Sequence, residues 1–278
     1  MSETNALALL DAAVRAAFAG GQAIMEVYGT AIEVDVKADN SPLTRADREA
    51  HAAIKRILDG TGLPVMSEEG RTIPAAERQA WSHYWLVDPL DGTKEFIRRN
   101  GEFAVCIALM QADTNDPRPQ GNASPIAGVV YGPVDDVLYY AWEGGGAYRQ
   151  QHAATQAPVP TYERAAMSTR LPLARTDRAY TILASRSHRG AETEAYIAEQ
   201  RAAHGEVAFA FTGSALKFGL LAEGAADVYP RHAPTMEWDT AAGQIICTEA
   251  GRHLIDLTTQ APMRYNKHEP VNNWFIVQ

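Results

Sequence analysis

The sequence contains only two cysteines, Cys106 and Cys247, among its 278 residues. They lie about half the chain apart, so they form no CxxC pair, zinc quartet or disulfide framework. We interpret both as small core residues of a reduced protein. The eight histidines form no HxH or HExxH pattern, which gives no support to a zinc hydrolase. The absence of a GxxxxGKS/T motif excludes a P-loop kinase.

Basic residues are also scarce. The chain has 25 Lys and Arg against 34 Asp and Glu, which gives a formal net charge of −9. A protein that binds nucleic-acid polymers usually carries a basic face, so we expect no such partner. The acid surplus either aids solubility or supplies oxygen ligands for hard cations, and the total charge does not choose between them.

Long apolar runs and a secretion signal are missing as well. Residues 1–18 lack the basic start and small-residue cleavage site of a signal peptide. No apolar run approaches the roughly 18 residues that a membrane span needs. We therefore expect a cytoplasmic protein without a transmembrane segment, with peripheral attachment to the inner membrane as an alternative. The sequence is compatible with a monomer or a homodimer.

The hydrophobic periodicity predicts helices and strands along the whole chain. Helices are expected at 4–28, 44–58, 190–203, 214–223 and 239–249. Strands are expected at 32–36, 63–66, 85–87, 103–110, 126–131, 137–141, 180–184, 207–211, 226–229, 252–257 and 273–277. A polar, proline-containing stretch at 151–161 indicates a boundary near 150–160. The order of elements after it favours α/β layering with crossover connections.

Three carboxylate clusters stand at predicted element ends. Residues 68–69 follow one strand, residues 88–91 follow the next, and Asp239 would open a helix. Taken singly, each has an ordinary interpretation as a solvated turn, a tight turn or a helix N-cap. Ligand sites in α/β proteins favour the carboxyl ends of strands, so the three clusters together indicate a site.

The segment 88–93 reads Asp-Pro-Leu-Asp-Gly-Thr. Its proline favours an extended backbone at Asp88, and its glycine permits a sharp bend after Asp91. The Leu90 carbonyl can then point the same way as both carboxylates, which makes a compact oxygen site suited to Mg²⁺. A helix or turn that begins at Gly92–Thr93 would direct free N–H groups to the same point, where they can hold a phosphate.

In order along the chain, these motifs resemble the signature of the Mg²⁺-dependent, lithium-sensitive phosphatases. The matching residues are Glu68–Glu69, Asp88-Pro-Leu-Asp91-Gly-Thr93 and Trp238-Asp239-Thr-Ala-Ala-Gly243. That superfamily includes inositol monophosphatases, fructose-1,6-bisphosphatases and 3′(2′),5′-bisphosphate nucleotidases. The resemblance implies an α/β (α+β) fold of the inositol monophosphatase and fructose-1,6-bisphosphatase type, a layered αβαβα sandwich. Residues 1–150 would carry most metal ligands, and residues 151–278 would complete the metal and substrate site.

Finer motifs resemble the bacterial branch of 3′(2′),5′-bisphosphate nucleotidases. Lys94-Glu95-Phe96, directly after the central motif, is similar to that branch rather than to inositol monophosphatases. Further matches lie at 37–44, 98–103, 185–188, 213–218 and 237–243. The loop at about 113–124 is longer than is usual in the branch, and we have no functional account of it.

The resemblance assigns a role to each matching residue. It implies that two or three Mg²⁺ ions bind to Glu68, Asp88, the Leu90 carbonyl, Asp91 and Asp239. It implies that the catalytic residues around the attacking water are Asp47, Thr44, Glu68 and Thr93. Attack by a metal-activated water requires no Cys, Ser or His nucleophile, so phosphate would leave without a phosphoenzyme.

A bisphosphate substrate needs further cations and donors. Arg186 and its neighbours follow the strand at 180–184, Lys217 lies one helical turn after Ser214, and Arg231 follows another strand. The implied substrate contacts are Glu68, Leu90, Asp91, Gly92, Thr93, Ser185, Arg186, His188, Ser214, Lys217, Arg231 and Asp239. Each of these cations also has an ordinary interpretation as a solvated surface charge, and His188 as a turn residue.

We therefore expect Mg²⁺-dependent hydrolysis of adenosine 3′,5′-bisphosphate to AMP and phosphate. The resemblance implies that this reaction clears a by-product of sulfate assimilation and that lithium competes at a Mg²⁺ site. A similar substrate is 3′-phosphoadenylyl sulfate. One alternative is an inositol or sugar phosphatase. A second alternative is a non-catalytic protein that binds phosphorylated metabolites. It is disfavoured because all five acids that the resemblance assigns to the site are present: Asp47, Glu68, Asp88, Asp91 and Asp239.

Overall fold

The computed structural model describes residues 3–36, 42–113, 121–156, 158–174, 177–184 and 190–278. Its helices are α1 (Glu3–Tyr28), α2 (Arg45–Asp59), α3 (Ala75–Arg78), α4 (Thr93–Ile97), α5 (Thr161–Met167), α6 (Ala191–His204), α7 (Leu216–Glu223), α8 (Ala241–Glu249) and the 3-10 helix η1 (Glu237–Asp239). Its first strands are β1 (Val34–Val36), β2 (Pro42–Thr44), β3 (Val65–Ser67), β4 (His83–Asp91), β5 (Ala104–Ala112), β6 (Ala123–Gly132), β7 (Val137–Trp142) and β8 (Gly146–Gln151). The later strands are β9 (Thr169–Leu171), β10 (Tyr180–Ala184), β11 (Val207–Phe211), β12 (Tyr229–Arg231), β13 (Leu254–Asp256), β14 (Ala261–Pro262) and β15 (Phe275–Val277).

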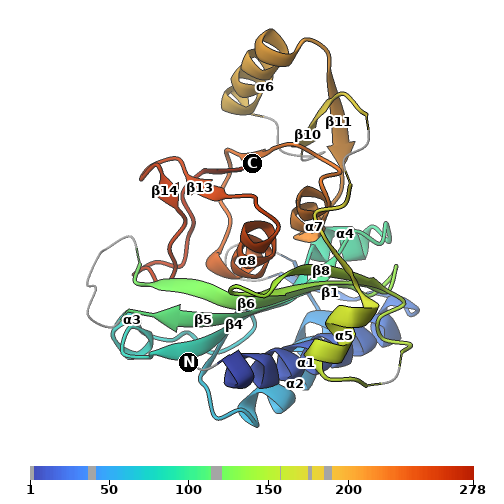
Figure 1. The fold of residues 1–278 in the computed structure, drawn as a ribbon. Helices are drawn as coiled ribbons and strands as arrows, with labels where there is room; N and C mark the ends of the chain where they lie inside the picture. The colour runs from blue at the N-terminus through green and yellow to red at the C-terminus, as the bar shows by residue number, and fades with distance from the viewer. Residues whose placement is uncertain (1–2, 37–41, 114–120, 157, 175–176, 185–189) are drawn as a thin grey trace.

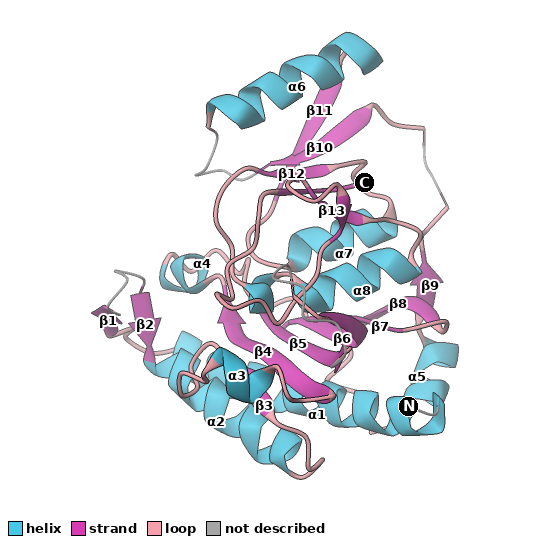
Figure 2. Ribbon diagram, turned by 90° about the vertical axis from the view of Figure 1, so that its left-hand side faces the viewer, coloured by secondary structure: helices cyan, strands magenta, loops and turns pink. Residues whose placement is uncertain are grey.

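These elements form five layers (Figure 1). α1 and α2 cover one face of a seven-stranded sheet with the order β3-β4-β5-β6-β7-β8-β9, and α7 and α8 cover the other face. Beyond α7 and α8 lie the sheets β12-β15-β13-β14 and β10-β11, with α6 outermost (Figure 2). The expected αβαβα sandwich is confirmed. β3 runs parallel to β4, whereas every later neighbouring pair in the large sheet is antiparallel.

The large sheet is buried on both faces, which explains the continuous apolar runs in its strands. Along β4, Trp85 and Val87 face the core under α1 and α2, and Leu86 faces the core under α8. Alternate side chains of a strand point to opposite faces, so each face receives its own apolar row. Gly128 of β6 permits close packing of α8, because a Cβ there would stand 2.9 Å from the Ala242 carbonyl oxygen.

α1 is long and apolar enough, over Asn5–Tyr28, to meet the criteria of length and hydropathy for a membrane-spanning helix. It nevertheless packs against α2 and the large sheet, and Leu10, Val14 and Ile24 lie in the core at 0%, 3% and 0% exposure. Its apolar character is therefore explained by burial within the protein.

The predicted elements that carry the site are present. α2 begins after Thr44 with the expected capping box, in which Thr44 and Asp47 bond each other's backbone amides. Asp239 closes η1 instead of opening α8, which begins at Ala241, because its carboxylate accepts from the Met236 amide. Neither the helices α3 and α5 nor the strands β2, β8, β9 and β14 were predicted. The division at residue 150 stays a prediction, and β9, which follows it, pairs with β8.

Candidate active site

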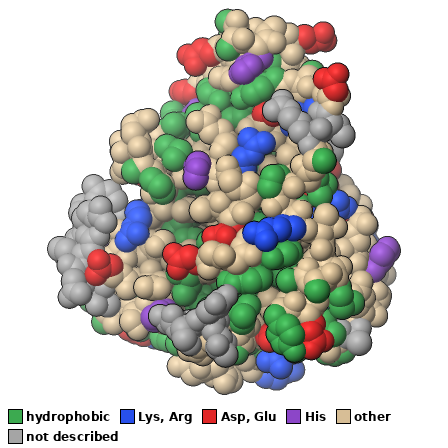
Figure 3. Space-filling view, in the orientation of Figure 1, with side chains coloured by type: hydrophobic (Ala, Val, Ile, Leu, Met, Phe, Trp, Pro, Cys, Tyr) green, Lys and Arg blue, Asp and Glu red, His purple; other side chains and the backbone are tan. Residues whose placement is uncertain are grey.

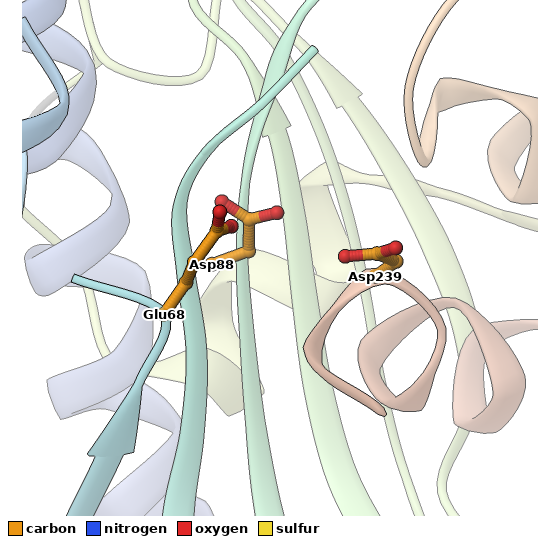
Figure 4. A group of neighbouring side chains, drawn as sticks. All are labelled: Glu68, Asp88 and Asp239. Carbon is orange, nitrogen blue, oxygen red and sulfur yellow. The ribbon is translucent and has the colours of Figure 1, made fainter. Parts of the chain in front are cut away.

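Three carboxylates from separate segments meet beside the C-terminal ends of β3 and β4 (Figure 4). One oxygen each from Glu68, Asp88 and Asp239 lies within 4.8 Å of the others. The parallel pairing of β3 with β4 aligns the first two, because Ser67 pairs with Val87 and the Glu68 amide donates to the Val87 carbonyl at 3.1 Å. η1 packs against β4 and β5 and brings the third carboxylate to the same point.

The electrostatics of this group favour a bound cation. Asp88 is 3% exposed, and burial followed by the charges of Glu68, Asp91 and Asp239 raises its pKa well above the ordinary value. Burial, and then Asp91, likewise raise the pKa of Asp239. The donors are all oxygen, with neither thiol nor imidazole in the group. This donor set fits a hard divalent cation such as Mg²⁺, whose charge offsets the mutual repulsion of the carboxylates.

Asp91 stands next to this group but is held differently. Its Oδ2 accepts from the Ala215 amide at 2.5 Å, which joins the end of β4 to the start of α7. Burial raises the pKa of Asp91 to about 6, and the Lys217 charge opposes that rise. The Leu90 amide donates to Asp88 Oδ1 at 3.0 Å, so the bend after Asp88 fixes that carboxylate. Asp91 therefore ties the metal side of the site to the C-terminal part of the chain.

A second polar group lies at the start of α2. Thr44 Oγ1 donates to Asp47 Oδ2 at 2.5 Å, and Thr93 Oγ1 lies 3.1 Å from Asp47 Oδ1 and 3.3 Å from the Leu90 carbonyl oxygen. Burial raises the pKa of Asp47, and the bonds from Thr44 and Thr93 partly offset it. This arrangement connects Asp47 to the metal-side loop through the Thr93 hydroxyl. In this position the Asp47 carboxylate can accept a proton or orient a water.

A cavity of about 520 Å³ opens beside these groups. Its lining includes six of the predicted site residues, Asp91, Gly92, Ser214, Lys217, Arg231 and Asp239. Figure 3 shows basic and acidic side chains next to each other in the middle of the visible face. The lining also includes residues for which sequence reasoning gave no role, Lys94, Arg98, Asn100, Tyr229 and Thr235. The sequence offered one reason to include Lys94 in the site, because Lys94 directly follows Thr93 in the matched motif.

Two cations of the cavity are suited to an anionic ligand. Lys217 is 7% exposed, and its Nζ donates to the Ser214 carbonyl at 3.2 Å and lies 5.6 Å from the Tyr229 ring centre. Arg231 Nε is buried and has no hydrogen-bond partner among the described residues. A buried donor without a partner is costly unless a ligand satisfies it. Ser185, Arg186 and His188, and the 37–41 part of the first motif, lie outside the described residues.

A prediction for the metal-free protein follows from the raised pKa of Asp91. At pH values between the ordinary aspartate pKa of 3.8 and the raised pKa of about 6, Asp91 keeps its proton in the folded protein and has lost it in the unfolded chain. Since the unfolded state then binds fewer protons, this group's contribution to the free energy of unfolding falls as pH rises through that window. With a chelator present to keep the protein free of metal, the decrease in Tm from about pH 4.5 to about pH 7 should be larger for the wild type than for Asp91→Asn. Equal drops in the two proteins would contradict the assignment.

The sequence was compared with those of known proteins, and relatives were found that match most of the chain. The profile of the inositol monophosphatase family matches residues 6–274. The chain is 42% identical over 273 residues to the 3′(2′),5′-bisphosphate nucleotidase CysQ of Escherichia coli K12, covering 95% of this chain and 97% of that protein. It is 44% identical over 244 residues to the protein of the same name from Salmonella typhimurium LT2, covering 85% of each.

Solved structures give the same picture. The crystal structure of CysQ from Bacteroides thetaiotaomicron, described as a bacterial member of the inositol monophosphatase family, superposes with a TM-score of 0.85 at 48% identity, covering 96% of this chain and 95% of that one. An IMPase from Thermotoga maritima superposes with a TM-score of 0.69 at 22% identity, covering 97% and 91%. The second likeness concerns the fold alone.

Proposed function

The chain belongs to the inositol monophosphatase family, and from this premise we propose that it is a Mg²⁺-dependent 3′(2′),5′-bisphosphate nucleotidase. It hydrolyses the 3′-phosphate of adenosine 3′,5′-bisphosphate and releases AMP and phosphate. The observation that carries the proposal is the group Glu68, Asp88 and Asp239 beside a cavity lined by Lys217 and Arg231. Relatives named for this activity match nearly the whole chain.

Each side of the site has a task in this reaction. Glu68, Asp88, Asp91, Asp239 and the Leu90 carbonyl would hold two or three Mg²⁺ ions, which would supply positive charge to the transferred phosphate and lower the pKa of a water. Two groups of the chain itself then act.

Asp47 accepts from Thr93 Oγ1, so these two groups would orient the attacking water, and the Asp47 carboxylate would receive its proton. Lys217 and Arg231 bind the phosphate that is not cleaved, with Ser214 as a neutral donor beside it, and the Gly92 and Thr93 amides face the phosphate that is cleaved. Ser185, Arg186 and His188 stay predicted contacts.

The substrate side yields a prediction on specificity. Arg231→Ala should raise KM for adenosine 3′,5′-bisphosphate by about tenfold or more, since a hydrogen bond to a charged group is worth about 1.5–3 kcal/mol. KM for a monophosphate, which lacks the second phosphate, should change less. Arg252→Ala is the matched control, because Arg252 is half-buried outside the cavity lining. Equal effects of Arg231→Ala on both substrates would remove Arg231 from this role.

The test of the proposal is a substrate panel followed by phosphate release. Adenosine 3′,5′-bisphosphate, 3′-phosphoadenylyl sulfate, inositol 1-phosphate and fructose 1,6-bisphosphate are compared with Mg²⁺, without it, and with added Li⁺. We expect the nucleotides to have the highest kcat/KM, activity to require Mg²⁺, and Li⁺ to inhibit. A preference above about tenfold for inositol phosphate would overturn the substrate assignment.

The cellular setting belongs to the same proposal. Removal of adenosine 3′,5′-bisphosphate would serve sulfate assimilation in the cytoplasm. The alternative of peripheral attachment to the inner membrane gains no support from the described residues, where α1 packs against α2 and the large sheet.

A further inference from the structure

A buried ion pair lies directly behind the turn that carries Asp239. Glu237 is 0% exposed, although it stands only two residues before a carboxylate of the site. Its Oε2 accepts from the Asn266 amide at 2.9 Å, and its Oε1 accepts from the Lys267 amide at 3.0 Å. Lys267 Nζ lies 2.8 Å from the same Oε1. The charge of Glu237 is therefore compensated from inside the protein and does not face the cavity.

Lys267 is held as firmly as its partner. It is 8% exposed, and besides Glu237 its Nζ donates to the Arg264 carbonyl at 3.0 Å and to Asn272 Oδ1 at 3.2 Å. An ammonium group has three protons, and these three acceptors use all of them. Lys267 therefore has no donor left for substrate, and it is absent from the cavity lining.

Asn272 extends this contact to both ends of the turn. It is 4% exposed, and its Nδ2 donates to the Met236 carbonyl at 2.7 Å and lies 2.9 Å from Thr240 Oγ1. Residues 236 and 240 flank η1, and the Met236 amide itself donates to Asp239 Oδ2 at 2.8 Å. Glu237, Lys267 and Asn272, which we call the clamp, thus fix the middle and both ends of the turn.

We propose that Lys267, with Asn272, is a positioning residue that sets the affinity of the site for its metal by holding the Asp239 turn through Glu237. This inference rests on the proposed function. Repulsion among Glu68, Asp88 and Asp239 favours movement of Asp239 away from the group when the metal is absent. A clamped turn keeps the carboxylate in place, so binding does not have to restore the geometry. Outer partners that orient ligands typically contribute about 10–100-fold in metal affinity.

The test measures metal binding itself. Mn²⁺, which takes the same oxygen ligands as Mg²⁺, is titrated calorimetrically into metal-free protein at a temperature well below every Tm. Lys267→Met should weaken Mn²⁺ binding by about 10–100-fold. In the activity assay, kcat should return toward the wild-type value at high Mg²⁺, because no group that touches substrate has changed.

A matched control separates this role from a loss of stability. Arg178 and Asp227 form another ion pair, with side-chain exposures of 19% and 6%, and neither residue lines the cavity. Arg178→Met should lower Tm yet leave the Kd for Mn²⁺ unchanged. Should Lys267→Met fail to fold, the double variant Glu237→Gln with Lys267→Met leaves no buried unpaired charge and is measured in its place.

The outcomes are distinguishable. A change of less than about fivefold in the Kd for Mn²⁺, or an equal change in Arg178→Met, overturns the positioning role while the proposed function stands. A wild-type protein that binds no Mn²⁺ overturns both. Weakened binding confined to the variants of the clamp supports the proposal.

Discussion

Asp88→Asn is expected to lower kcat/KM by at least about a hundredfold, the range for loss of a central electrostatic group. Asp88 is the most deeply buried of the three grouped carboxylates, at 3% exposure, and the amide that replaces it has almost the same volume. The variant therefore loses a charge and a metal ligand, but the substitution leaves no cavity in the protein. Mn²⁺ affinity, measured by the calorimetric titration described above, should fall with activity, and excess Mg²⁺ should not restore kcat.

The matched control for this variant is Asp256→Asn. Asp256 is 4% exposed and accepts from the Thr258 and Thr259 amides, and it belongs neither to the group of three carboxylates nor to the cavity lining. It should lose stability and keep kcat/KM within about threefold of the wild type. Near-normal turnover of Asp88→Asn at saturating Mg²⁺ would show that the metal assignment is wrong.

Asp47→Asn is expected to lower kcat by about 10²–10⁴-fold, the usual worth of general acid–base catalysis. The amide keeps a carbonyl oxygen for the Thr93 hydroxyl but cannot accept a proton from water. Asp47 lies outside the group of three carboxylates, so Mg²⁺ affinity should stay close to that of the wild type. A loss of metal affinity as large as that of Asp88→Asn would instead make Asp47 a ligand.

Two variants of Thr93 isolate the contact between this threonine and Asp47. Thr93→Ser retains the hydroxyl that lies 3.1 Å from Asp47 Oδ1, and Thr93→Val has nearly the same shape without it. Thr93→Ser should keep most of the activity, and Thr93→Val should lose most of it. Equal kcat in the two variants would remove Thr93 from the reaction.

The pH dependence of kcat should also report the role of Asp47 as the proton acceptor. Burial raises the pKa of Asp47 above its ordinary value, so the acidic limb of the kcat profile should lie above the range of an exposed aspartate. As pH falls through that raised pKa, Asp47 takes up a proton and can no longer accept one from water. The limb should be absent from the residual activity of Asp47→Asn.

The elements that position the site were predictable because their signals are local. The capping box of α2 places Thr44 and Asp47 three residues apart, and the bend after Asp91 follows from Gly92, which has a φ of 98°. The β8 strand was missed because its polar residues resemble a linker. Gln150 is in fact 2% exposed, and it accepts from the Arg164 side chain at 2.5 Å.

Contacts between distant segments were not predictable from one sequence. The Asp91 carboxylate bonds an amide 124 positions later, and Glu237 pairs with a lysine 30 positions later. Neither contact has a periodic or motif signal, because tertiary packing alone brings these groups together. Sequence reasoning therefore named the acids of the site and the two threonines that bond Asp47, but not Ala215 or Lys267.

The most direct test of the central claim is identification of the nucleotide formed from adenosine 3′,5′-bisphosphate at limiting Mg²⁺. Wild-type protein should release one phosphate per substrate and accumulate adenosine 5′-monophosphate, at a rate that rises with Mg²⁺ and collapses in Asp88→Asn. Adenosine 3′-monophosphate as the product, or release of phosphate that does not depend on Mg²⁺, would contradict the account.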